Sequence, residues 1–235
     1  MAVLRGLFAA FAMVAVVAAL LLVTAGLAPG GTWVWPRAWI ALAVIAAVTG
    51  AGSAALAVFR PENFAMRQQG LLARKEQRQP WIDAVGLVVF VTYLAAWVAF
   101  IPFDAFSVQL LPAPGPIVRI AGGLAGVAGL IITQLAVAQN RFATPTIHDQ
   151  SADGQRVIDT GLYSVVRHPL YAGNLLLYAG LALWLGSTAA LAGVLILLAF
   201  TLARIVIEER YLRASLPSYA DYARRVRGRL VPYIL

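Results

Sequence analysis

The chain has 235 residues, of which 61% are apolar and only 12% charged, and its formal net charge is +8. Soluble domains are about half apolar and about a quarter charged, so this composition, with a mean hydropathy of +0.81, excludes an ordinary soluble protein and indicates a polytopic membrane protein. The chain has no cysteine and only two histidines, which excludes disulfides and thiolate sites and argues against a bound metal.

Windows of about twenty apolar residues predict the membrane-spanning helices. They fall at 6–28, 38–59, 82–103 and 117–138, followed by a longer apolar block at 170–207. That block allows two crossings with a turn at Gly186-Ser187, although residues 170–186 are near the lower length limit and could also cross only partly. The first window exceeds the apolar core of a signal peptide, so we expect it to be retained. The predicted fold is all-α, a bundle of about six transmembrane helices with a C-terminal helical hairpin and a cytoplasmic tail.

The distribution of lysine and arginine predicts the orientation in the membrane. Five of these residues lie in 60–80, three in 141–168 and six after residue 208, whereas 104–116 has none and 29–37 has only Arg37. Because basic residues concentrate in cytoplasmic segments, we expect a multi-pass protein of the inner or plasma membrane with both termini in the cytoplasm. Anionic lipid headgroups then account for the net charge of the chain, and no nucleic acid partner is expected.

The fourth window carries a face of small residues. Its members are Gly122, Gly123, Ala125, Gly126, Ala128 and Gly129. Small residues let helix backbones approach closely, so this face predicts close packing against another helix. The packing could be within one chain or between two, which leaves the oligomeric state open.

A polar segment opens the last apolar block. Residues 161–174 read Gly-Leu-Tyr-Ser-Val-Val-Arg-His-Pro-Leu-Tyr-Ala-Gly-Asn. Pro169 suits the first turn of a helix, so the helix is expected to begin there and to direct its unpaired amides at the loop, which favours a carboxylate or phosphate. The alternative is an interfacial anchor, with Arg167 snorkelling and Tyr163 and Tyr171 in the aromatic belt.

A second ionisable cluster lies at the far end of the same block. Arg204 precedes Glu208 by four residues, so the two share a helix face and can pair, and Glu209 follows. A carboxylate at this depth suits a cationic ligand, and an arginine suits an acidic one. Because 170–207 is expected to form a hairpin, the His168 end and the Glu208 end return to one membrane face and can meet.

These motifs together resemble a known family. The run from Gly161 to Gly173, the Glu208-Glu209 pair with Leu212, and Ser-Tyr-Ala-Asp-Tyr at 218–222 are similar to the isoprenylcysteine carboxyl methyltransferase family, much of whose pattern is shared by phospholipid N-methyltransferases. The resemblance covers about residues 140–235. It implies an integral membrane enzyme that uses S-adenosyl-L-methionine, with residues 1–140 as a four-helix region shaping the acceptor pocket and 141–235 as the cofactor-binding catalytic region.

The resemblance also implies roles for individual residues. Arg204 would bind the substrate and act in catalysis together with Glu209. The residues expected to line the cofactor are His148, Gln155, Arg156, Val157, Ile158, Tyr163, His168, Pro169, Leu170, Tyr171 and Glu208. The chain departs from the eukaryotic pattern at Gln155-Arg156, where His-Thr is usual, and at His148, where glutamine is common, so contacts there could run through the backbone.

The methyl acceptor stays open between several classes. An acidic acceptor, such as the carboxylate of a prenylated cysteine, is nucleophilic once Arg204 orients it, and we favour this isoprenylcysteine-type carboxyl O-methylation. A phospholipid amine would need a proton removed, with assistance from Glu209 or His168, and a small thiol is a further alternative. The expected partners are therefore the cofactor, a hydrophobic or lipid-like acceptor and membrane lipids. A transporter or lipid-binding protein is the non-enzymatic alternative.

Overall fold

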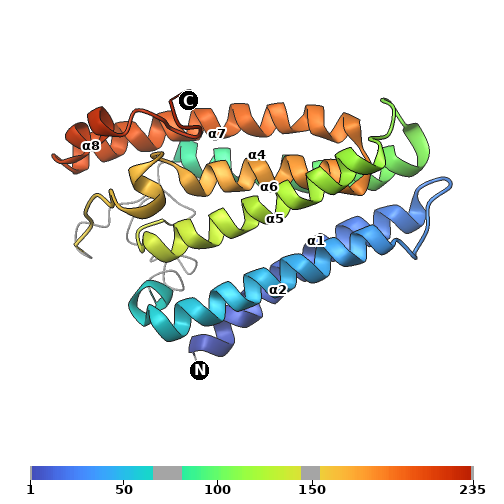
Figure 1. The fold of residues 1–235 in the computed structure, drawn as a ribbon, viewed down its shortest axis with the longest axis horizontal. Helices are drawn as coiled ribbons and strands as arrows, with labels where there is room; N and C mark the ends of the chain where they lie inside the picture. Colours follow the sequence, from blue (N-terminus) through green and yellow to red (C-terminus); the bar gives the residue numbers. More distant parts are fainter. Residues whose placement is uncertain (1, 66–80, 144–153, 234–235) are drawn as a thin grey trace.

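The computed structural model describes residues 2–65, 81–143 and 154–233, and the regular structure in these ranges is helical throughout. Long helices lie roughly side by side along one axis (Figure 1). The α-helices are α1 (Ala2–Leu27), α2 (Pro36–Phe59), α4 (Trp81–Phe103), α5 (Pro116–Gln139), α6 (Pro169–Leu185), α7 (Thr188–Ser215) and the short α8 (Tyr219–Arg225). A π-helix, Asp104–Val108, extends α4, and a 3-10 helix, Gly161–Ser164, precedes α6. The all-α prediction is confirmed for the described residues.

Each predicted apolar window forms a helix. In the described part of the chain, α2, α4 with its π-helical extension, α5 and α7 are long and apolar enough to cross a membrane, whereas α6 and the Phe11–Leu27 part of α1 are apolar but shorter. Large apolar side chains point outward from these helices, such as Val88 on α4, Leu124 on α5 and Leu195 on α7. Exposed apolar surface of this extent suits contact with lipid. Six crossings and their orientation stay predictions.

Proline and glycine set several helix boundaries, including the predicted start of α6 at Pro169. The helices α2, α5 and α6 each begin with a proline, whose missing N–H costs nothing in the first turn. Gly186 ends α6 with a positive φ of 95°, which favours glycine. Ser187 then caps α7, because its Oγ accepts from the Ala190 amide at 2.9 Å. The predicted Gly186-Ser187 turn is therefore confirmed.

The small-residue face of α5 packs tightly against α6. A Cβ at Gly129 would lie 2.5 Å from the carbonyl oxygen of Gly173, and a Cβ at Gly180 would lie 2.4 Å from the Gly126 nitrogen. Real Cβ atoms do not approach this closely, so the contact requires glycine on both helices. The predicted close packing is confirmed, and it occurs within the chain. It fixes α6, whose first turn carries the candidate site.

The bundle has two ends, which we name by what they carry. The turn end holds the α1–α2 and α6–α7 connections and the segment between α4 and α5, and the tail end holds α8 and the start of α1 (Figure 1). Between them lies an apolar core in which Leu21, Ile101, Leu185 and Leu197 are fully buried. Trp97 joins this core, and its indole Nε1 donates to the Ala190 carbonyl at 2.8 Å, which ties α4 to α7.

Candidate functional site

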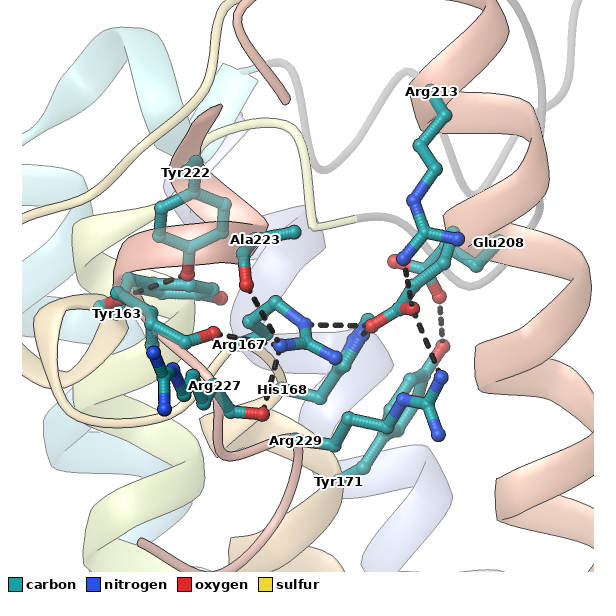
Figure 2. Close-up of polar contacts among 12 residues, drawn as sticks. Tyr163, Arg167, His168, Tyr171, Glu208, Arg213, Tyr222, Ala223, Arg227 and Arg229 are labelled. Carbon is teal, nitrogen blue, oxygen red and sulfur yellow. Dashed lines mark hydrogen bonds and ion pairs between the residues drawn. The ribbon is translucent and has the colours of Figure 1, made fainter. Parts of the chain in front are cut away.

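The two ionisable clusters predicted from the sequence meet at the tail end. The Tyr171 hydroxyl, on the first turn of α6, donates to Glu208 Oε2 at 2.7 Å (Figure 2). The same hydroxyl accepts from Arg204 Nε at 3.0 Å. Tyr171 thus lies between a guanidinium and a carboxylate that stand one turn apart on α7. We call these three residues the Tyr171 cluster.

Glu209 forms a second group, in which three arginines and His168 surround one carboxylate. Its Oε1 contacts Arg167 Nε at 2.7 Å and His168 Nε2 at 3.3 Å. Its Oε2 accepts from Arg213 at 3.2 Å and from Arg229 at 3.3 Å. The carboxyl side chain is only 1% exposed, so both oxygens are occupied inside the protein. We call these five residues the Glu209 network.

Arg167 fastens the tail to the loop before α6. Besides the Glu209 contact, its Nη1 donates to the carbonyls of Val226 at 2.6 Å and Arg227 at 2.9 Å (Figure 2). The backbone amides of Arg167 and His168 donate to the carbonyls of Gly228 and Arg229, each at 2.9 Å. The alternative of a snorkelling Arg167 is wrong, because the residue is 8% exposed and its guanidinium is satisfied within the chain.

The short helix α8 anchors the 3-10 helix and the segment before it. The Tyr222 hydroxyl donates to the Tyr163 carbonyl at 2.8 Å (Figure 2). Tyr222 and Tyr219 are buried together, with Val157 packed against them. An exposed ion pair between Arg225 and Asp159 adds a second contact to the same segment, with 2.6 Å between nitrogen and oxygen. Residues 157–163 are therefore held in place by the tail.

The remaining residues predicted to line the cofactor fall into separate groups. The His168 ring stacks on Tyr171, with centroids 5.6 Å apart, and Pro169 is buried at the start of α6. Leu170 packs instead against Leu56, Phe64 and Val137. The Tyr163 hydroxyl faces the Ala136 carbonyl of α5 at 3.4 Å, and burial raises its pKa to about 12, so the hydroxyl stays neutral.

The predicted stretch from Gln155 to Ile158 shows a mixed exposure. Arg156 is exposed, whereas Gln155, Val157 and Ile158 are half-buried. His148 lies outside the described residues. The structure thus brings His168, Tyr171, Glu208, Arg204 and Glu209 together, and it places the side chains of Leu170 and Tyr163 in other contacts.

The Tyr171 cluster, with the His168 ring stacked on it, offers groups for both a cation and an anion. Two stacked aromatic rings and a half-buried carboxylate suit a cation, and the guanidinium suits an anion. No group of three or more His, Cys, Asp or Glu residues that could hold a metal occurs among the residues with described positions. The carboxylate and the stacked rings fit the positively charged group of the cofactor that the family resemblance implies.

Several residues of the Glu209 network were not predicted to act in the site. Arg167, Arg213 and Arg229 contact Glu209, and Tyr222 supports the neighbouring loop. The spacing of four residues between Glu209 and Arg213 is a helix-pair signal that could have been found in the sequence. The Arg167 pair joins residues 42 positions apart and has no local signal.

Two comparisons with known proteins match parts of the chain. A family model described as phospholipid methyltransferase matches residues 117–218, from the second residue of α5 to the residue before α8. The cobalt-zinc-cadmium resistance protein CzcN of Cupriavidus metallidurans is 43% identical over 72 residues, which are 29% of this chain and 32% of that protein. The match thus spans about a third of that relative. Residues 117–218 carry the pattern of the phospholipid methyltransferase family, which confirms the family resemblance drawn from the sequence.

Proposed function

We propose that the chain is an integral membrane methyltransferase that takes its methyl group from S-adenosylmethionine and transfers it to a hydrophobic, lipid-like acceptor. The observation that carries this proposal is the Tyr171 hydroxyl, which contacts both Arg204 and Glu208 inside the stretch that matches the methyltransferase family. One anion-binding and one cation-binding side chain thus converge on the same hydroxyl. A methyl donor that is cationic and an acceptor that is anionic need this combination.

The residues that would hold the cofactor are His168, Tyr171 and Glu208. When bound, the cofactor supplies a methyl group on a positively charged sulfur. The aromatic faces of His168 and Tyr171 and the Glu208 carboxylate would favour that charge. The protein's contribution is mainly to hold donor and acceptor in the reactive orientation, because methyl transfer from a sulfonium needs little further activation.

Glu209 acts as a positioning residue in this proposal. Its two oxygens already contact three arginines and His168, and the side chain is 1% exposed, so it is poorly placed to take a proton from a substrate. It holds Arg167 and His168, and His168 in turn stacks on Tyr171. The Glu209 network thereby fixes the ring that the cofactor would contact.

Arg204 supports a carboxylate as the acceptor group, of the isoprenylcysteine type. A carboxylate carries no proton that must be removed, so orientation by a guanidinium is sufficient for its oxygen to attack. Arginine presents a planar set of donors that matches a carboxylate in two-point contact. Arg204 lies one turn before Glu208 on α7, nearer to the apolar part of the helix, from which a lipid-like chain would approach.

Phospholipid amine N-methylation is the second candidate, favoured by the description of the matching family. An amine must lose a proton before or during transfer, so this reaction needs a base. Glu208 is better placed than Glu209 for this task, because it is half-buried and accepts from the neutral Tyr171 hydroxyl. The two candidates therefore differ in which side chain matters most, Arg204 or Glu208.

Two measurements test the proposal on the purified full-length protein. Isothermal titration with S-adenosylmethionine in detergent should show saturable binding, and its absence would favour the transporter or lipid-binding alternative. A labelled-methyl assay should then compare a farnesyl-cysteine analogue, phosphatidylethanolamine and a simple thiol. Transfer to the cysteine analogue supports carboxyl methylation, whereas transfer only to phosphatidylethanolamine or to the thiol replaces it.

A further inference from the structure

A pair of arginines converges at the turn end, far along α6 from the Tyr171 cluster. Arg37 is the second residue of α2, and Arg119 lies in the first turn of α5. A Cβ built on Gly186 would lie 3.3 Å from Arg37 Nη1 and 3.8 Å from Arg119 Nη2, so both guanidiniums approach the same point beside the end of α6. The Trp184 indole donates to the Arg37 carbonyl at 2.8 Å and fixes the neighbouring backbone.

The charge of this pair is not balanced by a carboxylate in the described part of the chain. No salt bridge joins Arg37 or Arg119 to an acidic residue there, and Arg37 Nη1 and Arg119 Nε are buried without a hydrogen-bond partner. Asp104 contacts the adjacent Ser187, but its oxygens accept from Ser187 Oγ at 2.6 Å and from the Leu110 amide at 2.9 Å. The end of α6 contributes only about half a negative charge against two cations. Buried donors of this kind call for an anion.

An apolar groove lies directly beside the arginine pair. It encloses about 220 Å³ between α2, α5 and α6, and its walls include Ile40, Val44, Leu124, Val127, Leu177 and Trp184. Ile40 lies one turn along α2 from Arg37, and Ile120, also in the wall, follows Arg119 directly. The groove therefore begins within about one helical turn of both arginines, along α2 and α5, and continues along the helices. Gly123 and Gly126 of α5 also line it.

We propose that this site binds an anionic phospholipid, with its phosphate on Arg37 and Arg119 and one acyl chain in the groove. Two converging guanidiniums match a phosphate group, and an apolar groove at their side matches the chain attached to it. A free phosphate would use only the first of these features. The Trp184 ring lines the groove, and its indole nitrogen donates to the Arg37 carbonyl. An aromatic ring with one polar end suits the boundary between a lipid headgroup and its acyl chain.

The lipid site is separate from the proposed methyltransferase site and does not depend on it. The arginine pair lies beside Gly186 at the end of α6, whereas Tyr171 lies in its first turn. The groove lies on the α5 side of α6, where Gly180 packs, while Tyr171 contacts α7. The proposed occupant is therefore a bound lipid of the leaflet at the turn end and not the methyl acceptor.

Native mass spectrometry of the delipidated full-length protein tests the headgroup. The protein is mixed with equal amounts of phosphatidylglycerol and phosphatidylcholine that have the same acyl chains. Wild type should retain phosphatidylglycerol about tenfold or more over phosphatidylcholine, and R37Q/R119Q should lose that preference. The control R60Q/R227Q removes two positive charges at the tail end and should keep it. Equal retention of the two lipids by wild type, or a preference that survives in R37Q/R119Q, overturns the proposal.

Further variants test the groove and keep the headgroup test valid if R37Q/R119Q does not fold. R37K/R119K keeps both charges and should retain a weaker preference for phosphatidylglycerol, even where the glutamine variant does not fold. Val127→Trp fills the groove and should weaken the binding of both lipids without changing the preference. If Val127→Trp binds both lipids as tightly as wild type, the acyl chain does not occupy the groove. Displacement of phosphatidylglycerol by an equal concentration of inorganic phosphate shows that an anion alone suffices, and overturns the lipid as occupant.

Discussion

Two adjacent carboxylates of α7, Glu208 and Glu209, serve two different regions of the molecule. Glu209 is 1% exposed and contacts three arginines and His168, which come from the loop before α6, from α7 itself and from the tail. Glu208 is half-buried, and its Oε2 accepts from the neutral hydroxyl of Tyr171. Successive positions on a helix point about 100° apart, so one residue faces the Glu209 network and the other faces the Tyr171 cluster.

The different surroundings of the two carboxylates suit them to different roles, one structural and one in ligand binding. A carboxylate that is surrounded by cations holds chain segments together and has no capacity left for a ligand. A carboxylate whose contact is a phenol can exchange that contact for a cationic ligand at a smaller cost. We therefore assign the fastening of the tail to Glu209 and the recognition of the cofactor to Glu208, and the variants below test that division.

Glu209→Gln is expected to have the largest effect of any single change in this region. The variant leaves Arg167 buried without its anion, and losing one partner of a buried pair costs about 3–5 kcal/mol. Thermal unfolding in detergent should show a large drop in Tm, and limited proteolysis should cut the tail after residue 215 more readily. The matched control is Asp221→Asn, which breaks an exposed pair with Arg224 and should change Tm very little. A Glu209→Gln protein as stable as wild type would contradict the fastening role.

Glu208→Gln should weaken cofactor binding and leave the fold intact. The change keeps the shape of the side chain but removes the charge that would face the cofactor, so affinity should fall about tenfold to a hundredfold. Titration calorimetry measures the affinity, and Tm should stay close to that of wild type. Glu62→Gln, at an exposed carboxylate 3.8 Å from Arg141, is the matched control and should bind the cofactor normally. Unchanged affinity in Glu208→Gln means that the cofactor site lies elsewhere.

Arg204→Lys should lower turnover more than it lowers cofactor affinity. Lysine keeps the charge but lacks the two-point geometry, so the loss corresponds to one charge-assisted contact, roughly 1.5–3 kcal/mol or about tenfold to a hundredfold in rate. Methyl transfer to the farnesyl-cysteine analogue and calorimetry with the cofactor separate the two quantities. Near-normal turnover with intact affinity would show that Arg204 serves only as a partner of Tyr171, and would remove it from acceptor recognition.

The fold could be predicted from the sequence because its signals are local. Apolar windows of sufficient length became helices, Pro169 began α6, and Gly186 ended it. The small residues on α5 indicated close packing, since only glycine tolerates the contacts seen between Gly129 and Gly173. What the sequence did not identify was the partner of that face, because α6 was one of several apolar helices that could have covered it.

The candidate site could be predicted only in part, because its contacts join distant segments. The sequence indicated that the first turn of α6 and the last turns of α7 could meet, since a hairpin returns its ends to one face. It gave Arg167 the alternative role of an interfacial anchor, because nothing local pairs it with Glu209 or with the tail carbonyls. It also could not show that Leu170 and Tyr163 turn toward other helices, which depends on how the neighbouring helices pack.

Tyr222→Phe should have the smallest effect of the four changes, and it tests whether α8 only supports the site. The hydroxyl of this residue, which is 2% exposed, donates to the Tyr163 carbonyl at 2.8 Å. Its removal leaves a buried carbonyl without that donor and should cost about 1–2 kcal/mol. Burial raises the pKa of Tyr222 above its usual value, so the hydroxyl keeps its donating proton at neutral pH. This stabilisation is lost only as the pH rises above the usual tyrosine pKa of about 10 and through the raised pKa of the folded protein.

The Tyr222→Phe effect should therefore be constant with pH and confined to stability. The difference in Tm between wild type and variant should stay the same from about pH 6 to about pH 9, because neither the folded nor the unfolded tyrosine titrates strongly there. Tyr233→Phe is the matched control, since that side chain is 99% exposed and its loss should leave Tm unchanged. Cofactor affinity should stay within about twofold of wild type, because Tyr222 contacts the loop backbone and not the Tyr171 cluster. A tenfold loss of affinity without a change in Tm would instead place α8 in the cofactor site.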